Sequence, residues 1–445
     1  MPKITHRKKR LSSFKLIVLG FAGVIVLGAL ILMLPFSSTA GVVTPFHEAL
    51  FTSTSAVCVT GLVVQDTGSY WSAFGQTVIL LLIQIGGLGV VTVAAFFAML
   101  SGRKISLMQR STMQDAISAP KVGGIVRLTR FIVRGTFLIE LIGMIVMLPT
   151  FCGNYGIKGI WMAAFHSVSA FCNAGFDILG TAENKYPSLT GYIGNPAINI
   201  TIMLLIIVGG IGFLTWDDIY TNKWHFKKYR MQSKVILVTT AILIIAPAVF
   251  FFFCDFTGLP LAERILASLF QSVTPRTAGF NTADLSAMTG SSKAIMTLLM
   301  LVGGSPGSTA GGMKTTTLAV LILSAFSVCR KKDDAEVCGR RIDGSAVKNA
   351  AAVAVMYFLL FFVGGIVIST AEGLPLSTCL YETASAVGTV GLTLGITPQL
   401  GVLSQLILIV LMYLGRVGGL TLIYAAVSNK NQSGAKLPLE KITVG

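Results

Sequence analysis

The sequence predicts an all-α membrane protein made of four repeated units, each with a helix, a re-entrant pore loop and a second helix. Hydrophobic residues make up 53% of the 445 residues, charged residues only 12%, and the mean hydropathy is +0.79. This composition excludes an ordinary soluble protein. The same order of apolar segments also occurs four times. We therefore expect eight transmembrane helices and four short pore helices in a pseudo-fourfold arrangement.

Clusters of basic residues define the expected cytoplasmic face. The net charge of +16 could favour nucleic acid, but most of the 34 Lys and Arg residues lie between the apolar blocks. Such loops stay on the cytoplasmic side of a membrane, so we expect membrane lipid and no nucleic acid. The clusters are residues 3–15, 103–134, 223–234, 330–348 and 430–441. This pattern predicts a multi-pass plasma-membrane protein with both termini in the cytoplasm.

The apolar blocks give the boundaries of the units. Each helix is expected to supply the roughly 20 residues that a bilayer requires. The first helices are expected near residues 14–36, 128–150, 235–256 and 347–370, and the second near 76–100, 196–215, 293–326 and 401–427. The expected units are 14–101, 128–216, 235–328 and 347–428, between an N-terminal segment (1–13) and a C-terminal tail (429–445).

A shorter apolar segment lies between the two helices of every unit. Each copy begins with Phe or Tyr, has Ser or Thr two and four residues later, and reaches Gly nine or ten residues after the aromatic. The copies are FTSTSAVCVTG (51–61), FHSVSAFCNAG (165–175), FQSVTPRTAG (270–279) and YETASAVGTVG (381–391). Since a helix this short cannot cross a bilayer, each segment is expected to enter the membrane and return.

The backbone after each short helix would then lie at membrane depth with unpaired polar groups. Such backbone is stable only inside protein or beside a water-filled cavity. Four strands around one axis would present rings of carbonyl oxygens that bind weakly hydrated cations, and a terminal Gly keeps side chains out of the path. Helix C-cap glycines would explain one copy, but four aligned copies favour a pore.

These motifs resemble the Trk/Ktr/HKT superfamily of potassium transporters, and bacterial KtrB-type subunits most, over about residues 14–427. The matching pore loops are VCVTGL, FCNAGF, TPRTAGF and VGTVGLT. The resemblance implies K⁺ transport through backbone carbonyls. In this family a Ser in place of the first filter Gly goes with sodium selectivity, and here all four positions are Gly. The implied filter residues are Val59, Thr60, Gly61, Asn173, Ala174, Gly175, Thr277, Ala278, Gly279, Thr389, Val390 and Gly391.

The resemblance also implies partners. Family members of this type form homodimers and work with a cytosolic ring of RCK/KTN nucleotide-binding subunits, on which ATP or ADP would bind. No cofactor is expected on this chain itself, and a role for Na⁺ as an activator stays open.

The second helices carry a glycine motif of their own: GGLG (86–89), GGIG (209–212), GGSP (303–306) and GRVG (415–418). In the first two copies we interpret the small residues as sites of close helix packing. In the fourth copy Arg416 places a cation near the bilayer midplane, at a cost of about 2.5–3.5 kcal/mol. We therefore expect Arg416 to have a partner or a function.

The tract GGSPGSTAGGMK interrupts the second helix of the third unit. A phosphate-binding loop is disfavoured because Met313 separates Gly312 from Lys314 and no soluble strand precedes the tract. A plain connecting loop is disfavoured because residues 294–302 alone are too short to span. We interpret the tract as an intramembrane loop that moves across the pore, as in the resembled family. The expected gate residues are Gly303, Gly304, Ser305, Pro306, Gly307, Ser308, Thr309, Ala310, Gly311, Gly312, Lys314 and Arg416.

Other functions explain the sequence less well. Proton- or sodium-coupled symport is the nearest alternative, but proton carriers usually have several titratable groups at membrane depth, and here Glu140 is the main candidate. A non-transporting scaffold would not explain four matched half-helices, and no HExxH motif points to an enzyme. Arg276 is expected to point outward or behind the filter, where a carboxylate could pair with it.

Overall fold

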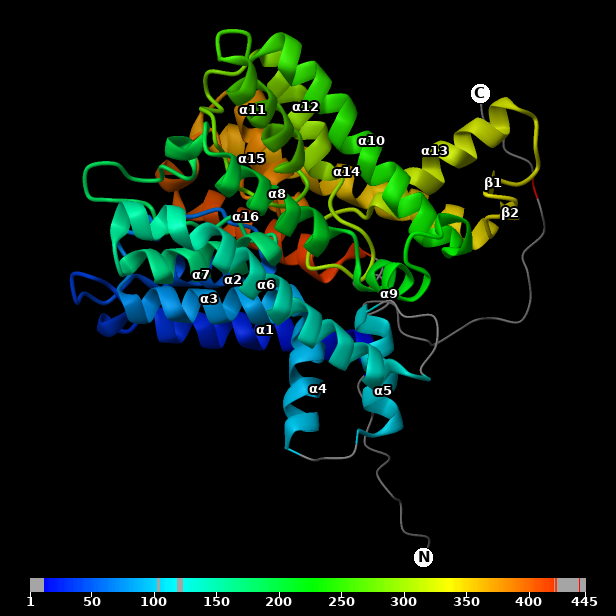
Figure 1. The fold of residues 1–445 in the computed structure, drawn as a ribbon, viewed down its shortest axis with the longest axis horizontal. Coiled ribbons are helices and arrows are strands. Elements are labelled where there is room, and N and C mark those ends of the chain that lie inside the picture. Colours follow the sequence, from blue (N-terminus) through cyan, green and yellow to red (C-terminus); the bar gives the residue numbers. More distant parts are fainter. Residues whose placement is uncertain (1–11, 102–104, 118–122, 420, 422–439, 441–445) are drawn as a thin grey trace, which may run out of the picture.

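The computed structural model describes residues 12–101, 105–117, 123–419, 421 and 440 and is almost entirely helical (Figure 1). Units 1 and 2 each have a first helix, a pore helix and a second helix in two pieces. Unit 1 contains α1 (Ser13–Leu32), α2 (Phe46–Cys58), α3 (Ala73–Leu88) and α4 (Val90–Leu100), followed by the connecting helix α5 (Leu107–Ile117). Unit 2 contains α6 (Ile125–Tyr155), α7 (Lys158–Phe171), α8 (Pro196–Gly210) and α9 (Phe213–Asn222).

Units 3 and 4 repeat this order. Unit 3 contains α10 (Met231–Cys254), α11 (Leu261–Val273), α12 (Gly290–Leu301) and α13 (Thr315–Cys329). Strands β1 (Glu336–Val337) and β2 (Arg340–Arg341) form a short antiparallel hairpin before unit 4. Unit 4 contains α14 (Gly344–Glu372), α15 (Leu376–Gly388) and α16 (Val402–Val417). The expected N-terminal segment and C-terminal tail lie almost wholly outside the described residues.

Local sequence sets where many of these helices begin. The pore helices α2, α11 and α15 start directly after Pro45, Pro260 and Pro375. Proline has no backbone N–H and its ring clashes with a preceding helical turn, so a helix does not extend to the N-terminal side of it. Elsewhere a polar side chain accepts a hydrogen bond from the first turn, as N-cap residues do. These N-caps are Ser12 for α1, Ser72 for α3, Asn195 for α8 and Thr289 for α12.

Within the described residues, four helices are long and apolar enough to cross a bilayer, namely α1, α6, α10 and α14. Between 28% and 33% of the residues in their apolar windows are buried inside the chain. The rest of these windows faces outward, as expected for a surface in contact with lipid.

The second helices of units 1 and 2 differ from the sequence prediction. Continuous helices over 76–100 and 196–215 are predicted, but α3 and α4 meet at 95° and α8 and α9 at 98°. The breaks fall at Gly89 and Gly212, with φ of +84° and +91°, a conformation open mainly to glycine. The prediction is wrong because the last Gly of each motif turns the chain.

Unit 3 is interrupted where the sequence predicts it. Helix α12 ends at Leu301 and α13 begins at Thr315, and the connecting loop folds back so that Val302 and Met313 pair as a parallel bridge. In unit 4, α16 ends at Val417 and Gly418 has φ of +86°. Each of the four second helices is thus interrupted or ends at or directly beside its glycine motif.

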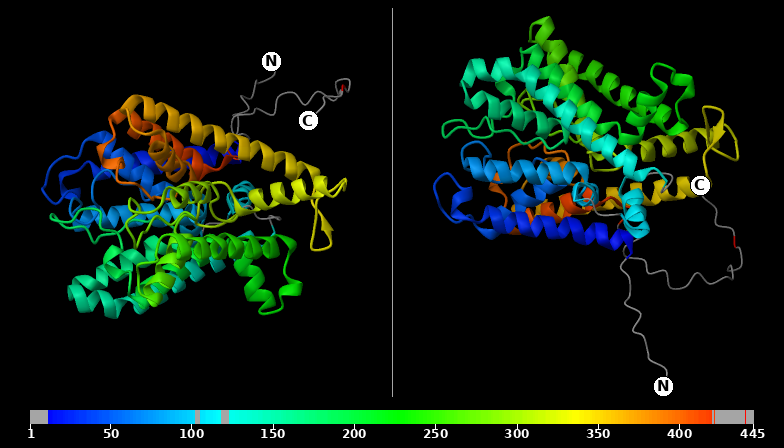
Figure 2. Two further views of the ribbon diagram at one scale, coloured as in Figure 1. Left: turned by 90° about the horizontal axis from the view of Figure 1, so that it is seen from above. Right: turned by 60° about the horizontal axis from the view of Figure 1, so that its bottom comes forward.

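The long helices of the four units lie roughly alongside one another in both views of Figure 2, and the contacts between units close into a ring. Each second helix packs against the pore helix of the next unit: α3 on α7, α8 on α11, α12 on α15, and α16 back on α2. This cyclic packing gives the pseudo-fourfold arrangement that the sequence predicts. It also encloses the pore helices, whose last three residues are buried in every unit.

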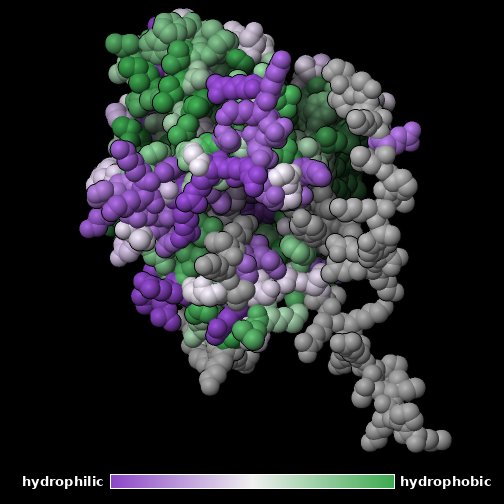
Figure 3. Space-filling view, turned by 90° about the vertical axis from the view of Figure 1, so that its right-hand side faces the viewer, coloured by the Kyte–Doolittle hydropathy of each residue, from purple (hydrophilic) through white to green (hydrophobic). Residues whose placement is uncertain are grey.

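The basic connections gather at one end of the long helices. Residues 223–230 lead into α10, and the β1–β2 hairpin precedes α14 at the right-hand end of Figure 1. Figure 3 looks onto this end and shows hydrophilic side chains across it, with hydrophobic side chains beside them. By the distribution of Lys and Arg, this end is the one expected to face the cytoplasm.

Candidate functional site

Each pore helix is followed within four residues by a residue with left-handed backbone. Val59, Asn173, Thr277 and Thr389 have φ between +53° and +67°. Two residues later the glycine again has positive φ: +92° at Gly61, +69° at Gly175, +80° at Gly279 and +95° at Gly391. The residue between them keeps a negative φ. Because φ alternates in sign, successive carbonyl oxygens turn to the same side of the strand, unlike those of a pleated β-strand.

The four glycines meet in a closed ring. A Cβ added to Gly61 would lie 3.2 Å from the Cα of Gly175, and one on Gly175 would lie 2.8 Å from the Cα of Gly279. The same holds from Gly279 to Gly391 (3.3 Å) and from Gly391 back to Gly61 (3.0 Å). Each added Cβ would also meet the carbonyl oxygen that precedes the next glycine: that of Ala174, Ala278, Val390 and Thr60 in turn. The axis is therefore lined by backbone oxygens where no side chain fits.

The hydroxyl four residues after each aromatic holds the strand to its own pore helix. The amide of Gly61 donates to Ser55 Oγ (3.0 Å), and that of Gly391 donates to Ser385 Oγ (2.9 Å). In units 2 and 3 the hydroxyl instead donates to the carbonyl just beyond the glycine, from Ser169 to Phe176 (2.7 Å) and from Thr274 to Phe280. The repeated Ser or Thr thus fixes the strands.

The hydroxyl two residues after the aromatic ties the pore helix to the first helix of its unit in three units. These bonds run from Ser53 to the Ile25 carbonyl of α1 (2.7 Å), from Ser167 to the Glu140 carbonyl of α6 (2.5 Å), and from Thr383 to the Phe361 carbonyl of α14 (3.1 Å). In unit 3, Ser272 bonds within α11 instead, to the Leu269 carbonyl. The two hydroxyl positions therefore have separate structural roles, which the sequence pattern alone does not distinguish.

A cavity of about 240 Å³ lies outside the ring and is lined by all four glycines. Asp66 and Asp177 contribute carboxylates to it. The pKa of Asp177 is raised to about 7, chiefly by burial; the hydrogen bond from the Leu179 amide opposes this rise, and the neighbouring charge of Asp66 adds to it. This mouth can attract cations when Asp177 is ionised.

The loop between α12 and α13 lies at the inner end of the strands. Thr309 Oγ1 lies 3.1 Å from Asn173 Oδ1, on the second strand. A Cβ on Gly311 would collide with the hydroxyl of Thr389, on the fourth strand. The loop therefore contacts the first residues of the second and fourth strands.

Backbone hydrogen bonds hold the loop to two other units. The amides of Ser305 and Thr309 donate to the carbonyls of Gly210 (2.9 Å) and Gly209 (3.2 Å), at the break of α8. The amide of Gly312 donates to the carbonyl of Gly415 in α16 (3.2 Å). In a continuous helix these carbonyl oxygens would accept from amides of the same helix. The ends of the helices in other units therefore supply acceptors for the loop.

The Arg416 side chain joins the loop to units 1 and 4. Its guanidinium donates to the carbonyl oxygens of Thr309 in the loop and of Gly86 and Gly87 (3.2 Å for Gly87) at the end of α3. Carbonyl oxygens thus serve as the partners that the sequence argument requires for a membrane-embedded arginine.

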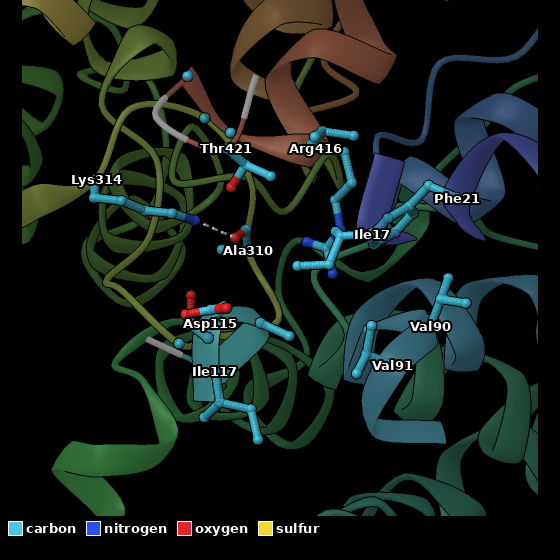
Figure 4. Close-up of a pocket in the computed structure, with 18 of the residues that line it drawn as sticks. Ile17, Phe21, Val90, Val91, Asp115, Ile117, Ala310, Lys314, Arg416 and Thr421 are labelled. Atoms are coloured by element: carbon cyan, nitrogen blue, oxygen red, sulfur yellow. Dashed lines mark hydrogen bonds between the residues drawn. The ribbon is translucent and has the colours of Figure 1, made fainter. Parts of the chain in front are cut away.

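A second cavity of about 220 Å³, called here the inner cavity, is lined by the loop and lies between Arg416 and Lys314 (Figure 4). Lys314 Nζ donates to the Ala310 carbonyl (2.8 Å), within the loop itself. Asp115 lines the same cavity from α5, and the tip of the loop reaches α5, because a Cβ on Gly307 would lie 2.5 Å from the Ile117 carbonyl.

Comparison with known proteins identifies the fold and the family. The family model TrkH, described as a cation transport protein, matches residues 22–434. The chain belongs to the TrkH family. The crystal structure of the potassium transporter TrkH from Vibrio parahaemolyticus covers 96% of this chain and 87% of its own, with a TM-score of 0.74 at 18% identity. That likeness shows that the TrkH fold is shared.

Two relatives of this TrkH-family chain match over nearly their whole length. The potassium/sodium uptake protein NtpJ of Enterococcus hirae is 39% identical, over 98% of each chain. The Ktr system potassium uptake protein B of Bacillus subtilis is 36% identical, over 97% of this chain and 96% of its own.

The structure of this TrkH-family protein gives partners to two buried charged residues, Arg276 and Glu140, that the sequence does not assign. Arg276 is buried behind the third strand, and its guanidinium donates to the Thr240 carbonyl (3.5 Å) rather than to a carboxylate. Glu140 is buried beside the second pore helix, where Gln84 donates to it (3.3 Å). Both contacts join elements far apart in the sequence, so spacing carries no signal for them.

Proposed function

We propose that this chain takes up potassium across the plasma membrane through the ring of the four strands. The supporting observation is the cyclic contact of the strand glycines with the preceding carbonyl of the next strand. Such oxygens can replace the hydration shell of K⁺. Relatives named as potassium uptake proteins, at 39% and 36% identity, support the choice of ion. The proposed filter comprises each glycine and the two residues before it.

We further propose that the loop of residues 303–312, with Lys314 and Arg416, is the gate. Its position at the inner end of the strands supports this role, and so do its bonds to two broken helices. Breaking a small number of hydrogen bonds would clear the path. The polar backbone of the loop would remain solvated by the inner cavity.

The membrane potential is the proposed driving force. It contributes about 2.3 kcal/mol per charge for each 100 mV, which supports accumulation without a coupled reaction. One relative is named a potassium/sodium uptake protein, and this name favours Na⁺ as a second ion or activator. Within the described residues Glu140 has Gln84 and Cys172 as its side-chain neighbours, which gives little support to a proton relay.

The proposed partners are a second copy of the chain and a cytosolic ring of RCK/KTN nucleotide-binding subunits that would carry ATP or ADP. The support is that a relative is named as one component of a Ktr system. The basic end of the molecule is the proposed docking side, and both termini are proposed to be cytoplasmic there.

Rb⁺ uptake into cells that lack their own potassium systems tests the function. Wild-type chain should restore uptake, and Gly391→Ala should abolish it, because a Cβ there meets the Thr60 carbonyl across the ring. Gly373→Ala is the control, since Gly373 also has positive φ (+67°) but open space around it. Equal uptake by the two variants would refute the filter assignment.

A further inference from the structure

The residue directly after the pore-helix aromatic is polar and fully buried in every unit. These residues are Thr52, His166, Gln271 and Glu382, each with 0% exposure. They occupy equivalent places behind the four strands. Since a buried polar side chain is costly without hydrogen bonds, their partners show what each position does.

Glu382 binds the segment that follows the fourth strand. Its Oε1 accepts from the Thr393 hydroxyl (2.6 Å) and the Leu394 amide (3.0 Å), and its Oε2 accepts from the Thr397 hydroxyl (2.8 Å). Thr393 lies two residues beyond Gly391 and lines the outer cavity. The carboxyl group thus connects the pore helix α15 to the outer mouth of the ring.

The other three positions have no such contact among the described residues. His166 Nδ1 bonds the Met162 carbonyl of its own helix (2.8 Å), and Nε2 has no partner. Gln271 Nε2 contacts Met296 Sδ (3.2 Å), and its Oε1 has no partner. The Thr52 hydroxyl is also unpartnered. Unit 4 is therefore different from its three counterparts.

The mouth segments of units 1, 2 and 3 are instead held by one another. Tyr186 of unit 2 donates through its hydroxyl to the Val64 carbonyl (2.9 Å) and through its amide to Asp66 (3.0 Å). The Asn281 amide of unit 3 donates to Ser188 Oγ of unit 2 (3.0 Å). Within the described chain, residues 392–400 make no hydrogen bond to another unit.

We infer that Glu382 is a positioning residue that fixes the outer end of the fourth strand and thereby the ion selectivity of the ring. This inference rests on the proposed filter. A carbonyl ring prefers K⁺ over the smaller Na⁺ only while its oxygens keep their number and spacing. Without Glu382 the segment directly beyond the fourth strand would lose its hydrogen bonds to the pore helix. The outer end of the strand would then be held by the bond from the Gly391 amide to Ser385 alone, and it could move inward around Na⁺.

Competition of K⁺ and Na⁺ against Rb⁺ uptake in proteoliposomes tests this role. In Glu382→Ala, Na⁺ should compete about tenfold better relative to K⁺, because three hydrogen bonds to the carboxyl group are lost. Glu382→Gln should remain near wild type. Its carbonyl oxygen can accept from Thr393 and Leu394, and its amide can donate to Thr397, whose hydroxyl already lies 3.2 Å from that of Thr393.

The matched control is Gln271→Leu at the equivalent position of unit 3, which should leave the K⁺ to Na⁺ preference unchanged. Thr397→Val removes one of the three bonds and should give a smaller loss of preference, so it provides a test if Glu382→Ala does not fold. Unchanged preference in both variants would overturn the inference, as would equal losses in Glu382→Gln and Glu382→Ala. The Gly391→Ala variant separates the two proposals. Intact Rb⁺ uptake by this variant would refute the filter assignment itself, whereas abolished uptake together with unchanged preference in the Glu382 variants would refute only the role of Glu382.

Discussion

Replacing Arg416 by Met should open the pore more often. Met retains an unbranched side chain much like the aliphatic part of arginine, and it lacks the guanidinium that donates to Thr309, Gly86 and Gly87. Only the bond to Thr309 holds the loop itself. A hydrogen bond to a charged group contributes about 1.5–3 kcal/mol, and each 1.4 kcal/mol corresponds to about tenfold. The open fraction should therefore rise by about 10- to 100-fold until it saturates.

The loop should not leave its place altogether in this variant. Backbone bonds from Ser305, Thr309 and Gly312 to the neighbouring units remain. Removing a cation from the inner cavity should also lower the electrostatic barrier to K⁺, so both effects act in the same direction. Folding should be little affected, because Gly87 lines the inner cavity, where its freed carbonyl can bind water.

The assay is the initial rate of Rb⁺ uptake into proteoliposomes containing equal amounts of purified protein, without any added regulatory subunit. Arg130→Met is the control, since Arg130 is an exposed arginine on α6, away from the loop. An uptake rate equal to that of wild type, or below it in a folded variant, would show that Arg416 does not hold the gate closed.

Three further predictions concern the gate, the mouth and the strands. Deleting residues 305–312 should raise Rb⁺ uptake, and unaltered uptake would make the tract a simple connector. Because the pKa of Asp177 is raised to about 7, its negative charge is lost as the external pH falls through that value. The apparent affinity for Rb⁺ should therefore weaken below about pH 7. The Asp177→Asn variant should have a weak affinity that does not change with pH in this range. Ser385→Ala leaves the buried Gly391 amide without its acceptor, at a cost of about 1–3 kcal/mol, and should reduce K⁺ preference over Na⁺ in the competition assay, whereas full preference would mean that the bond is dispensable.

Much of the fold could be predicted because the four short segments share one pattern. Length excludes a crossing helix, and the aromatic, the two hydroxyls and the glycine recur at fixed spacing. In the structure the second hydroxyl, such as Ser55 or Ser385, proves to hold the strand. The pattern could therefore locate the strands before any coordinates existed.

The breaks at Gly89 and Gly212 could not be predicted in the same way. The motifs GGLG and GGIG lack the proline and hydroxyl residues that mark the interrupted helix of unit 3, and small residues in a membrane helix more often indicate close packing. Indeed, Gly86 does pack closely, since a Cβ there would meet the Val57 carbonyl. Packing and breaking occur at neighbouring glycines of one motif.

The hydrogen-bond partners of Arg416 could also not be identified without the fold. Its contacts join residues 107 and 330 positions away in the chain, and they are backbone carbonyls, which every residue carries. Nothing in a local sequence distinguishes those carbonyls from others. The need for a partner followed from the cost of a buried charge, whereas its identity depends on tertiary packing.

Within the described residues, the loop that lies against the strands of the ring comes from unit 3 alone. A tetramer of identical subunits would bring four copies of such a loop to the same point, where they would overlap sterically. Joining the four quadrants in one polypeptide removes this conflict, because a single quadrant can carry the loop while two others provide the carbonyl groups that accept from its backbone amides. Covalent fusion therefore permits asymmetric control of an almost symmetric passage.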